Sequence, residues 1–123
     1  MTEFTEEFIL EGKSLLYVDF SRISGKDDLV KSIEVIKSII AKYPPNSLYT
    51  ITNVASFRFD SELKKILADL TAHNKPYVKY GAIIGMDGVK KIMVSAILKI
   101  TGRTNMLFAF SKQQAIELLM QKE

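Results

Sequence analysis

The chain has 123 residues, of which 47% are hydrophobic and 25% are charged, and its formal net charge at pH 7 is +3. This length fits one domain with a substantial core, and the composition is too apolar for intrinsic disorder. Since cysteine is absent, disulfides, thiolate chemistry and cysteine-ligated zinc sites are excluded.

The first residues, MTEFTEEF, are acidic and lack the apolar segment of a secretory signal, so we expect a cytoplasmic protein. Residues 8–20, FILEGKSLLYVDF, predict two strands joined by a tight turn at Glu11, Gly12 and Lys13. The second of these strands is apolar on both faces, which is typical of a strand that is covered on both sides.

A helix follows Gly25, because apolar residues then recur at spacings of three and four until Pro44 and Pro45 stop the helix. Its apolar stripe consists of Leu29, Ile33, Ile36, Ile40 and Tyr43. LYTITNV, residues 48–54, predicts a strand. Asp60 is a candidate N-cap for the next helix. The apolar stripe of that helix consists of Leu63, Ile66, Leu67 and Leu70.

The remaining chain alternates in the same way. YVKYGAIIG, residues 77–85, and NMLFAF, residues 105–110, predict strands on either side of a third helix. Ser111 and Gln114 have the spacing of a capping box for a last helix. The element order ββαβαβαβα predicts one α/β domain over residues 1–123, with a mostly parallel five-stranded sheet, an antiparallel first strand and four helices.

Two stretches of the chain resemble the STAS domains and their SpoIIAA-like relatives. SLYTITNVASFRFDSELKKIL, residues 47–67, looks like the strand, loop and helix around that family's D-S-S-G-L motif. KPYVKYGAIIGMDGVKKIMVSAILKITGR, residues 75–103, looks like the next strand and helix of the small SpoIIAA-like proteins. The resemblance implies a SpoIIAA-like fold, which is related to that of the CRAL-TRIO lipid carriers, and a function without catalysis.

In anti-sigma-factor antagonists of this family, a kinase partner phosphorylates a serine at the start of the second helix. The resemblance brings Ser61 to that position when Leu63 anchors the alignment. D-S-E-L is one residue shorter than the family motif, Glu62 replaces a small residue and the glycine is missing. Two interpretations of Ser61 remain open: it is a phosphoacceptor, or together with Asp60 it caps a helix.

Catalytic and metal-binding patterns are weak in this sequence. His73 is the only histidine, so a site with two histidine ligands cannot form within one chain. A dyad of His73 with Ser61 fails because twelve helical residues separate them by about 18 Å. Four polar residues follow strands at one predicted sheet edge: Asp19, Asn53, Asp60 and Asp87. Turn and cap roles explain each of them, so we expect no enzyme, metal or cofactor.

Positive charge concentrates in the carboxyl-terminal half. Residues 75–112 hold seven lysines and arginines against a single acid, Asp87. Such asymmetry permits an anionic partner, although lysines that solvate helix faces also explain it. Because tryptophan is absent and no RNP-like motif or recognition helix occurs, we do not expect nucleic acid to be that partner.

The third helix, KKIMVSAILKITGR at residues 90–103, has more apolar side chains than one buried face needs. When Val89 is set at 0° and each residue advances about 100°, one broad apolar stripe lies within about 80° of it and is predicted to cover the sheet. This stripe consists of Ile92, Met93, Ala96, Ile97 and Ile100. Val94 and Leu98 fall near 140° and 180°, so they are predicted to project outward beside lysines.

The predicted binding surface consists of Lys90, Lys91, Val94, Leu98, Lys99 and Arg103. Ordinary exposure of single apolar residues is one explanation for it. An interface with a second copy or another protein is the next, and shallow contact with an anionic membrane, or a lid over an apolar ligand or lipid, is the third. The sequence thus predicts a non-catalytic binding module, with a phosphorylation-switched regulator of the anti-sigma-factor-antagonist type as the alternative.

Overall fold

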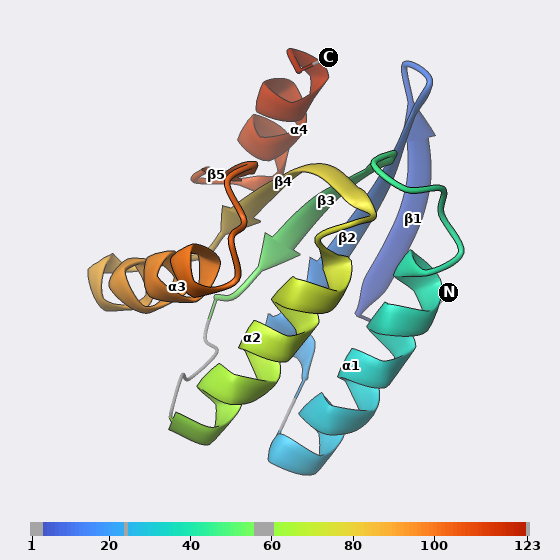
Figure 1. Ribbon diagram of the computed structural model, residues 1–123. Helices are drawn as coiled ribbons and strands as arrows, with labels where there is room; N and C mark the ends of the chain where they lie inside the picture. Colours follow the sequence, from blue (N-terminus) through green and yellow to red (C-terminus); the bar gives the residue numbers. More distant parts are fainter. Residues whose placement is uncertain (1–3, 24, 56–60, 123) are drawn as a thin grey trace.

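A five-stranded sheet organises the protein (Figure 1). The structure is a computed structural model, which describes residues 4–23, 25–55 and 61–122, apart from the side chains of residues 61–63. Its strands are β1 (Thr5–Leu10), β2 (Lys13–Asp19), β3 (Leu48–Asn53), β4 (Val78–Ile84) and β5 (Met106–Phe108). Its helices are the short 3-10 helix η1 (Phe20–Arg22), α1 (Lys26–Ile40), α2 (Ser61–Asn74), α3 (Gly88–Ile100) and α4 (Lys112–Met120). The predicted α/β class and element order are confirmed.

The strands lie in the spatial order β1-β2-β3-β4-β5. β1 runs antiparallel to β2, and the remaining neighbours run parallel. The β1–β2 turn has positive φ at both central residues, 51° at Glu11 and 78° at Gly12, as a two-residue hairpin turn of the primed type requires. The prediction of a parallel sheet with an antiparallel first strand is therefore correct.

Helices cover both faces of this sheet, but unequally. α1, α2 and α3 lie on one face, with α1 beside α2 and α2 beside α3, while α4 covers the other face (Figure 1). On β2, the successive residues Leu15 and Leu16 point to opposite faces and both are fully buried. The prediction that this strand is covered on both sides is confirmed.

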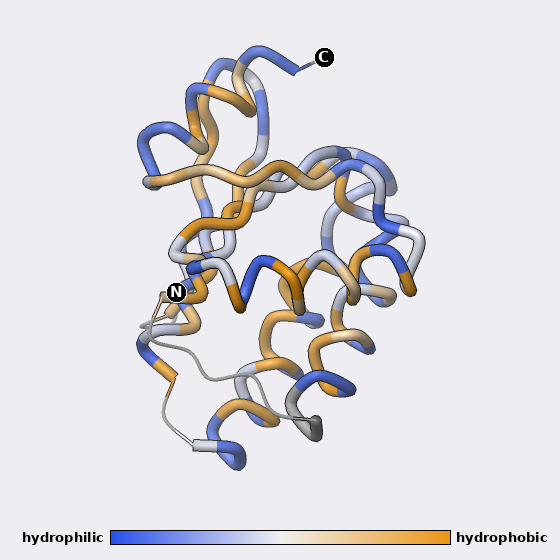
Figure 2. The backbone as a smooth tube through the Cα atoms, turned by 90° about the vertical axis from the view of Figure 1, so that its left-hand side faces the viewer, coloured by the Kyte–Doolittle hydropathy of each residue, from blue (hydrophilic) through white to orange (hydrophobic). Residues whose placement is uncertain are grey.

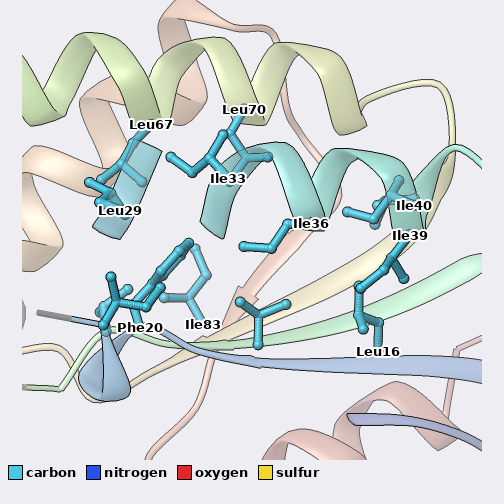
Figure 3. Packing of buried hydrophobic residues seen from close by; sticks show 14 of the residues in the cluster. Leu16, Phe20, Leu29, Ile33, Ile36, Ile39, Ile40, Leu67, Leu70 and Ile83 are labelled. Atoms are coloured by element: carbon cyan, nitrogen blue, oxygen red, sulfur yellow. The ribbon is translucent and has the colours of Figure 1, made fainter. Parts of the chain in front are cut away.

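The larger core lies between the sheet and the first three helices (Figure 3). The predicted stripe of α1 packs there with Leu67 and Leu70 of α2 onto Leu16, Phe20 and Ile83. The helical coils carry both hydrophobic and hydrophilic residues, as expected of helices that pack against a sheet on one side (Figure 2). Full burial of one such aliphatic side chain stabilises the fold by roughly 1.5–3 kcal/mol.

Helix α4 begins at a side-chain cap, and lysine contacts hold it against the other face of the sheet. The Ser111 hydroxyl accepts from the Gln114 backbone N–H at 3.0 Å, as the predicted capping spacing implies. Lys112 Nζ lies 2.9 Å from Glu6 Oε1 of β1 and 4.4 Å from the ring centroid of Tyr17. Lys13 Nζ donates to the Met120 carbonyl at 3.0 Å, so α4 is tied to the β1–β2 hairpin at both of its ends.

Candidate functional site

Helix α3 begins at a turn that its own residues stabilise. The Asp87 carboxylate accepts from the Lys90 backbone N–H at 2.9 Å, which caps the helix. Gly85 has φ 82°, and a Cβ there would lie 2.5 Å from the Ala55 backbone nitrogen, so only glycine fits this position. At the far end, the Thr101 hydroxyl donates to the Ile97 carbonyl at 2.8 Å.

The inner face of α3 is not the one that the helical wheel favours. Val94 and Ile97 are buried, and Leu98 is partly buried against the same core cluster. We call these three residues the inner face. The prediction that Val94 and Leu98 project outward is therefore wrong.

The opposite side of α3 presents large aliphatic side chains to solvent. Val89, Ile92 and Ile100 expose 70%, 74% and 77% of their surface. We call these three residues the outer stripe. The prediction that Ile92 and Ile100 cover the sheet is wrong, whereas the expectation that this helix carries a second, outward apolar face holds with different residues.

Polar anchors explain the orientation of α3. Lys90 lies beside the inner face, and its Nζ donates to the Val54 carbonyl at 2.9 Å. Arg103, just beyond the helix, donates from Nη1 to the Thr71 carbonyl of α2 at 3.1 Å. Turning the broader stripe inward would carry Lys90 away from Val54 and remove this hydrogen bond. A helical wheel that considers only apolar residues does not include this hydrogen bond.

The predicted basic residues separate into two groups. Lys91 and Lys99 are exposed on α3, and Lys91 Nζ lies 5.3 Å from the ring centroid of Phe108. On the helical wheel Lys99 is only about 20° from Ile92, so it borders the outer stripe. Lys90 is partly buried, and Arg103 is buried with 7% exposed. The prediction that Arg103 belongs to the binding surface is wrong, because its guanidinium lies in the interior.

Arg103 makes three polar contacts in that interior. Besides the Thr71 carbonyl, Nε donates to Asn105 Oδ1 at 3.2 Å and Nη2 lies 2.9 Å from Met106 Sδ. Burial lowers the pKa of the guanidinium from its ordinary value. Among the described residues no carboxylate forms an ion pair with Arg103. The nearby carboxyl end of α2 offers the negative end of a helix dipole instead.

A cavity of about 90 Å³ lies between the sheet and the three helices of the larger core. The inner face of α3 forms one wall of it, and side chains of α1 and α2 form others. Most of the lining is apolar. Five polar residues also reach the cavity: Thr50, Thr52, Thr71, Asn74 and Arg103.

The polar residues at the strand ends have local partners. Asp19 caps η1 by accepting from the Ser21 backbone N–H at 3.0 Å. Asn53 accepts from the Ala55 N–H at 2.9 Å and donates to the Tyr17 hydroxyl at 3.1 Å. Asp60 lies outside the described residues. Within the described ranges, no three side chains of the metal-ligating types gather into one cluster.

Ser61 and His73 lie at the two ends of α2. Ser61 is the first residue of α2, as the resemblance implies, and its side chain lies outside the described part of the chain. His73 is in the last turn of α2, where Nδ1 is 2.9 Å from Asn74 Oδ1 and the ring centroid is 5.7 Å from that of Tyr77. These contacts account for the histidine without a ligand.

Sequence reasoning missed the outer stripe as a surface and Thr50 as a cavity residue. The signal for the stripe was present, since Val89, Ile92 and Ile100 share one side of the wheel. For Thr50 the signal was the alternation of LYTITNV, in which two threonines two residues apart lie on one face of β3. No analysis of apolar spacing alone would have brought Arg103 to the same cavity.

The described residues include no helix that combines the length and the apolarity needed to cross a membrane. α3, the most apolar stretch discussed above, has 13 residues, whereas a spanning helix needs about 20. Comparisons of the chain with family models, curated proteins and solved structures found no match.

Proposed function

We propose that this domain is a cytoplasmic, non-catalytic binding module that contacts an anionic membrane surface through the outer stripe of α3. One observation carries the proposal: three large aliphatic side chains of a single helix, Val89, Ile92 and Ile100, are each exposed by 70% or more. Single exposed apolar residues are common, but three on one side of a single helix are a cluster of the kind that marks interaction sites.

The charges around the stripe favour lipid over an apolar protein surface. Lys99 borders the stripe, Lys91 is exposed elsewhere on the same helix, and residues 88–112 contain no acid. Anionic headgroups complement ammonium groups, and each lysine near such a surface contributes about 1 kcal/mol. Aliphatic side chains and flanking lysines on one helix are the combination that lets an amphipathic helix lie in the membrane interface.

Helix α1 supplies an internal contrast. Its exposed aliphatic residues, Val30 and Val35, are 44% and 38% exposed, which is less than any member of the outer stripe. The charges around them are mixed, since α1 carries three acids, Asp27, Asp28 and Glu34, beside three lysines, Lys26, Lys31 and Lys37. Carboxylates of this kind would be repelled by anionic lipid, so α1 is not proposed to take part.

Co-sedimentation with vesicles tests this function. Wild-type protein is expected to bind phosphatidylserine–phosphatidylcholine vesicles more tightly than pure phosphatidylcholine vesicles, and high salt should weaken the binding by screening the lysines. The double variant Ile92→Asn/Ile100→Asn should lose most of the binding while keeping its circular dichroism spectrum. Ile9→Asn is the matched control, because Ile9 is 75% exposed on β1 at the opposite edge of the sheet.

Two results would overturn the proposal. One is a wild-type protein that binds neither type of vesicle at low salt. The other is an Ile9→Asn variant that loses as much binding as the double variant. Light scattering on the same samples reports a second copy or another protein as the occupant: a dimer that the double variant abolishes would assign the outer stripe to a homodimer instead.

A second candidate function rests on α2. We propose as the alternative that the domain is a STAS-type, phosphorylation-switched regulator with Ser61 as the acceptor. The supporting observation is that Ser61 is the first residue of α2, since the positive end of a helix dipole stabilises a phosphate. Incubation with kinases from the host, followed by mass spectrometry, tests this candidate. Absence of phosphate from Ser61 under conditions of active partner switching counts against it.

A further inference from the structure

Arg103 is a buried cation at the wall of a cavity. A guanidinium carries five N–H donors, and three contacts from Arg103 reach the Thr71 carbonyl, the Asn105 side chain and the Met106 sulfur. Sulfur is a weak acceptor, and no carboxylate pairs with the charge among the described residues. N–H donors of the guanidinium therefore remain available to a further acceptor, and no carboxylate of the described residues neutralises its positive charge.

Thr50 is a second polar group at this cavity. It is only 6% exposed and it lines the same space as Arg103. Its hydroxyl forms no hydrogen bond with another described residue, and buried hydroxyls without partners are rare because they cost free energy. Since no fully enclosed polar atom of the described residues lacks a partner, the Thr50 oxygen reaches open space, which is the cavity.

Met106 lies beside both polar groups, packed against the backbone of Gly81. A Cβ at Gly81 would lie 2.6 Å from Thr50 Oγ1 and 2.7 Å from Met106 Sδ. Arg103 Nη2 contacts that sulfur at 2.9 Å. The hydroxyl and the guanidinium thus both line the cavity beside the Met106 thioether. Most of the remaining lining, such as Ile36, is apolar, and Thr52, Thr71 and Asn74 are its other polar residues.

Size and polarity narrow the class of ligand. A cavity of about 150 Å³ accepts benzene, so one of about 90 Å³ holds roughly four non-hydrogen atoms, about the size of acetate or propionate. A carboxylate matches the paired N–H groups of a guanidinium and also accepts from a hydroxyl. Apolar walls suit an alkyl group and disfavour a doubly charged anion such as phosphate.

We propose that this cavity binds a short-chain aliphatic monocarboxylate. Its carboxylate pairs with the Arg103 guanidinium and accepts from the Thr50 hydroxyl, and its alkyl group lies among the aliphatic side chains that include Ile97. The site is on the inner face of α3, so it does not depend on the proposed membrane contact of the outer stripe.

Titration followed by NMR chemical shifts and by thermal unfolding tests the site. The probes are acetate, propionate, butyrate and hexanoate at constant ionic strength, with propanamide as the neutral match of propionate and inorganic phosphate as a second anion. Propionate is expected to shift resonances of cavity residues and to raise the melting temperature. Propanamide and phosphate should bind at least about tenfold more weakly, since neither supplies both a single negative charge and an alkyl group.

Two variants test the roles proposed for Thr50 and Arg103. Thr50→Val retains the side-chain shape and removes the hydroxyl, so it should stay folded and bind propionate about tenfold more weakly. Arg103→Lys retains a charge without the paired donors and should also weaken the binding of propionate. No shift with any carboxylate, equal binding of acid and amide, or unchanged binding by a folded Thr50→Val variant would each overturn the site.

Discussion

Two isoleucines of one helix, Ile92 and Ile97, have opposite environments. Ile97 is 4% exposed against α2 and the sheet, whereas Ile92 is 74% exposed on the outer stripe. The side chains are identical, so hydrophobicity does not decide which of them is buried. The difference follows from the polar groups beside each face, because Lys90 and Arg103 reach backbone carbonyls only when Ile97 points inward. An apolar helix can thus have two candidate faces whose burial is decided by charged residues.

The largest expected effect comes from shortening these two side chains in turn. Ile97→Ala should destabilise the domain by about 2–5 kcal/mol, because it leaves a cavity in a packed core. Ile92→Ala should change stability by less than about 0.5 kcal/mol, because it removes only exposed surface. Chemical denaturation of both variants measures the difference, and equal losses would show that the two faces of α3 are not distinct.

Two glycines extend the comparison to the backbone, one in β4 and one at the start of α3. Gly81→Ala should destabilise the domain by about 1–3 kcal/mol, since its Cβ would lie 2.6 Å from both Met106 Cε and Thr50 Oγ1. Gly88→Ala, in the first turn of α3, meets nothing within 4 Å and should be neutral or stabilise by up to about 1 kcal/mol. Thermal unfolding of the pair separates them, and a Gly81→Ala variant as stable as wild type would remove the close packing inferred there.

Replacing a lysine on each face of α3 should affect different properties, stability for the inner face and vesicle binding for the outer stripe. Lys90→Met removes the hydrogen bond to the Val54 carbonyl and should cost about 0.5–1.5 kcal/mol of stability. Lys99→Met should leave stability within about 0.5 kcal/mol and reduce binding to anionic vesicles instead. Denaturation and vesicle sedimentation on both variants complete the comparison. The account fails here if Lys99→Met is the more destabilising of the two.

The smallest expected effect is on the pH dependence of stability, and it comes from Tyr43, which lies outside α3 and titrates only at alkaline pH. Burial and a hydrogen bond of 2.6 Å to Glu7 raise the pKa of Tyr43 from its ordinary value of 10 to about 12. Because this pKa is raised in the folded state, the protonated tyrosine stabilises the fold below pH 10. This stabilisation is lost as the pH rises through about 12. Solvent screening limits the contribution to about 1 kcal/mol or less.

The Tyr43→Phe variant isolates this contribution from the lysines that titrate in the same range. The stability difference between wild type and variant should be constant below pH 10 and should shrink between pH 10 and 12. Urea denaturation across that range measures it. A difference that grows with pH would reverse the sign of the linkage and contradict the hydrogen bond to Glu7.

The fold was largely predictable from local patterns. The apolar residues on both faces of β2, the 3–4 spacing in α1 and the capping residue Ser111 each predict elements that the structure contains. Gly12 predicts the hairpin turn because glycine adopts positive φ without steric cost, whereas the positive φ of Glu11 is imposed by the turn. These features depend on residues close together in the chain, which is why the sequence alone reveals them.

The rotation of α3 and the cavity depend instead on contacts between distant residues. Lys90 meets Val54 and Arg103 meets Thr71, at separations of 36 and 32 residues. A helical wheel contains neither carbonyl, so it places the broadest apolar stripe inward. Thr50 joins Arg103 only after β3 and β5 have been brought into one sheet.

Thiol labelling tests the central claim most directly, because the natural sequence contains no cysteine. Three single variants replace isoleucines in different environments: Ile92→Cys on the outer stripe, Ile97→Cys on the inner face and Ile9→Cys on β1. The rate of reaction with a thiol reagent is measured for each, without vesicles and with phosphatidylserine-containing vesicles.

The account predicts fast labelling at positions 92 and 9 in solution and slow labelling at position 97. Vesicles should slow the reaction at position 92 and leave position 9 unchanged, because only the outer stripe enters the membrane interface. Faster labelling at position 97 than at position 92 in solution would contradict the orientation of α3. Unchanged labelling at position 92 with saturating vesicles would contradict its role as the membrane-binding surface.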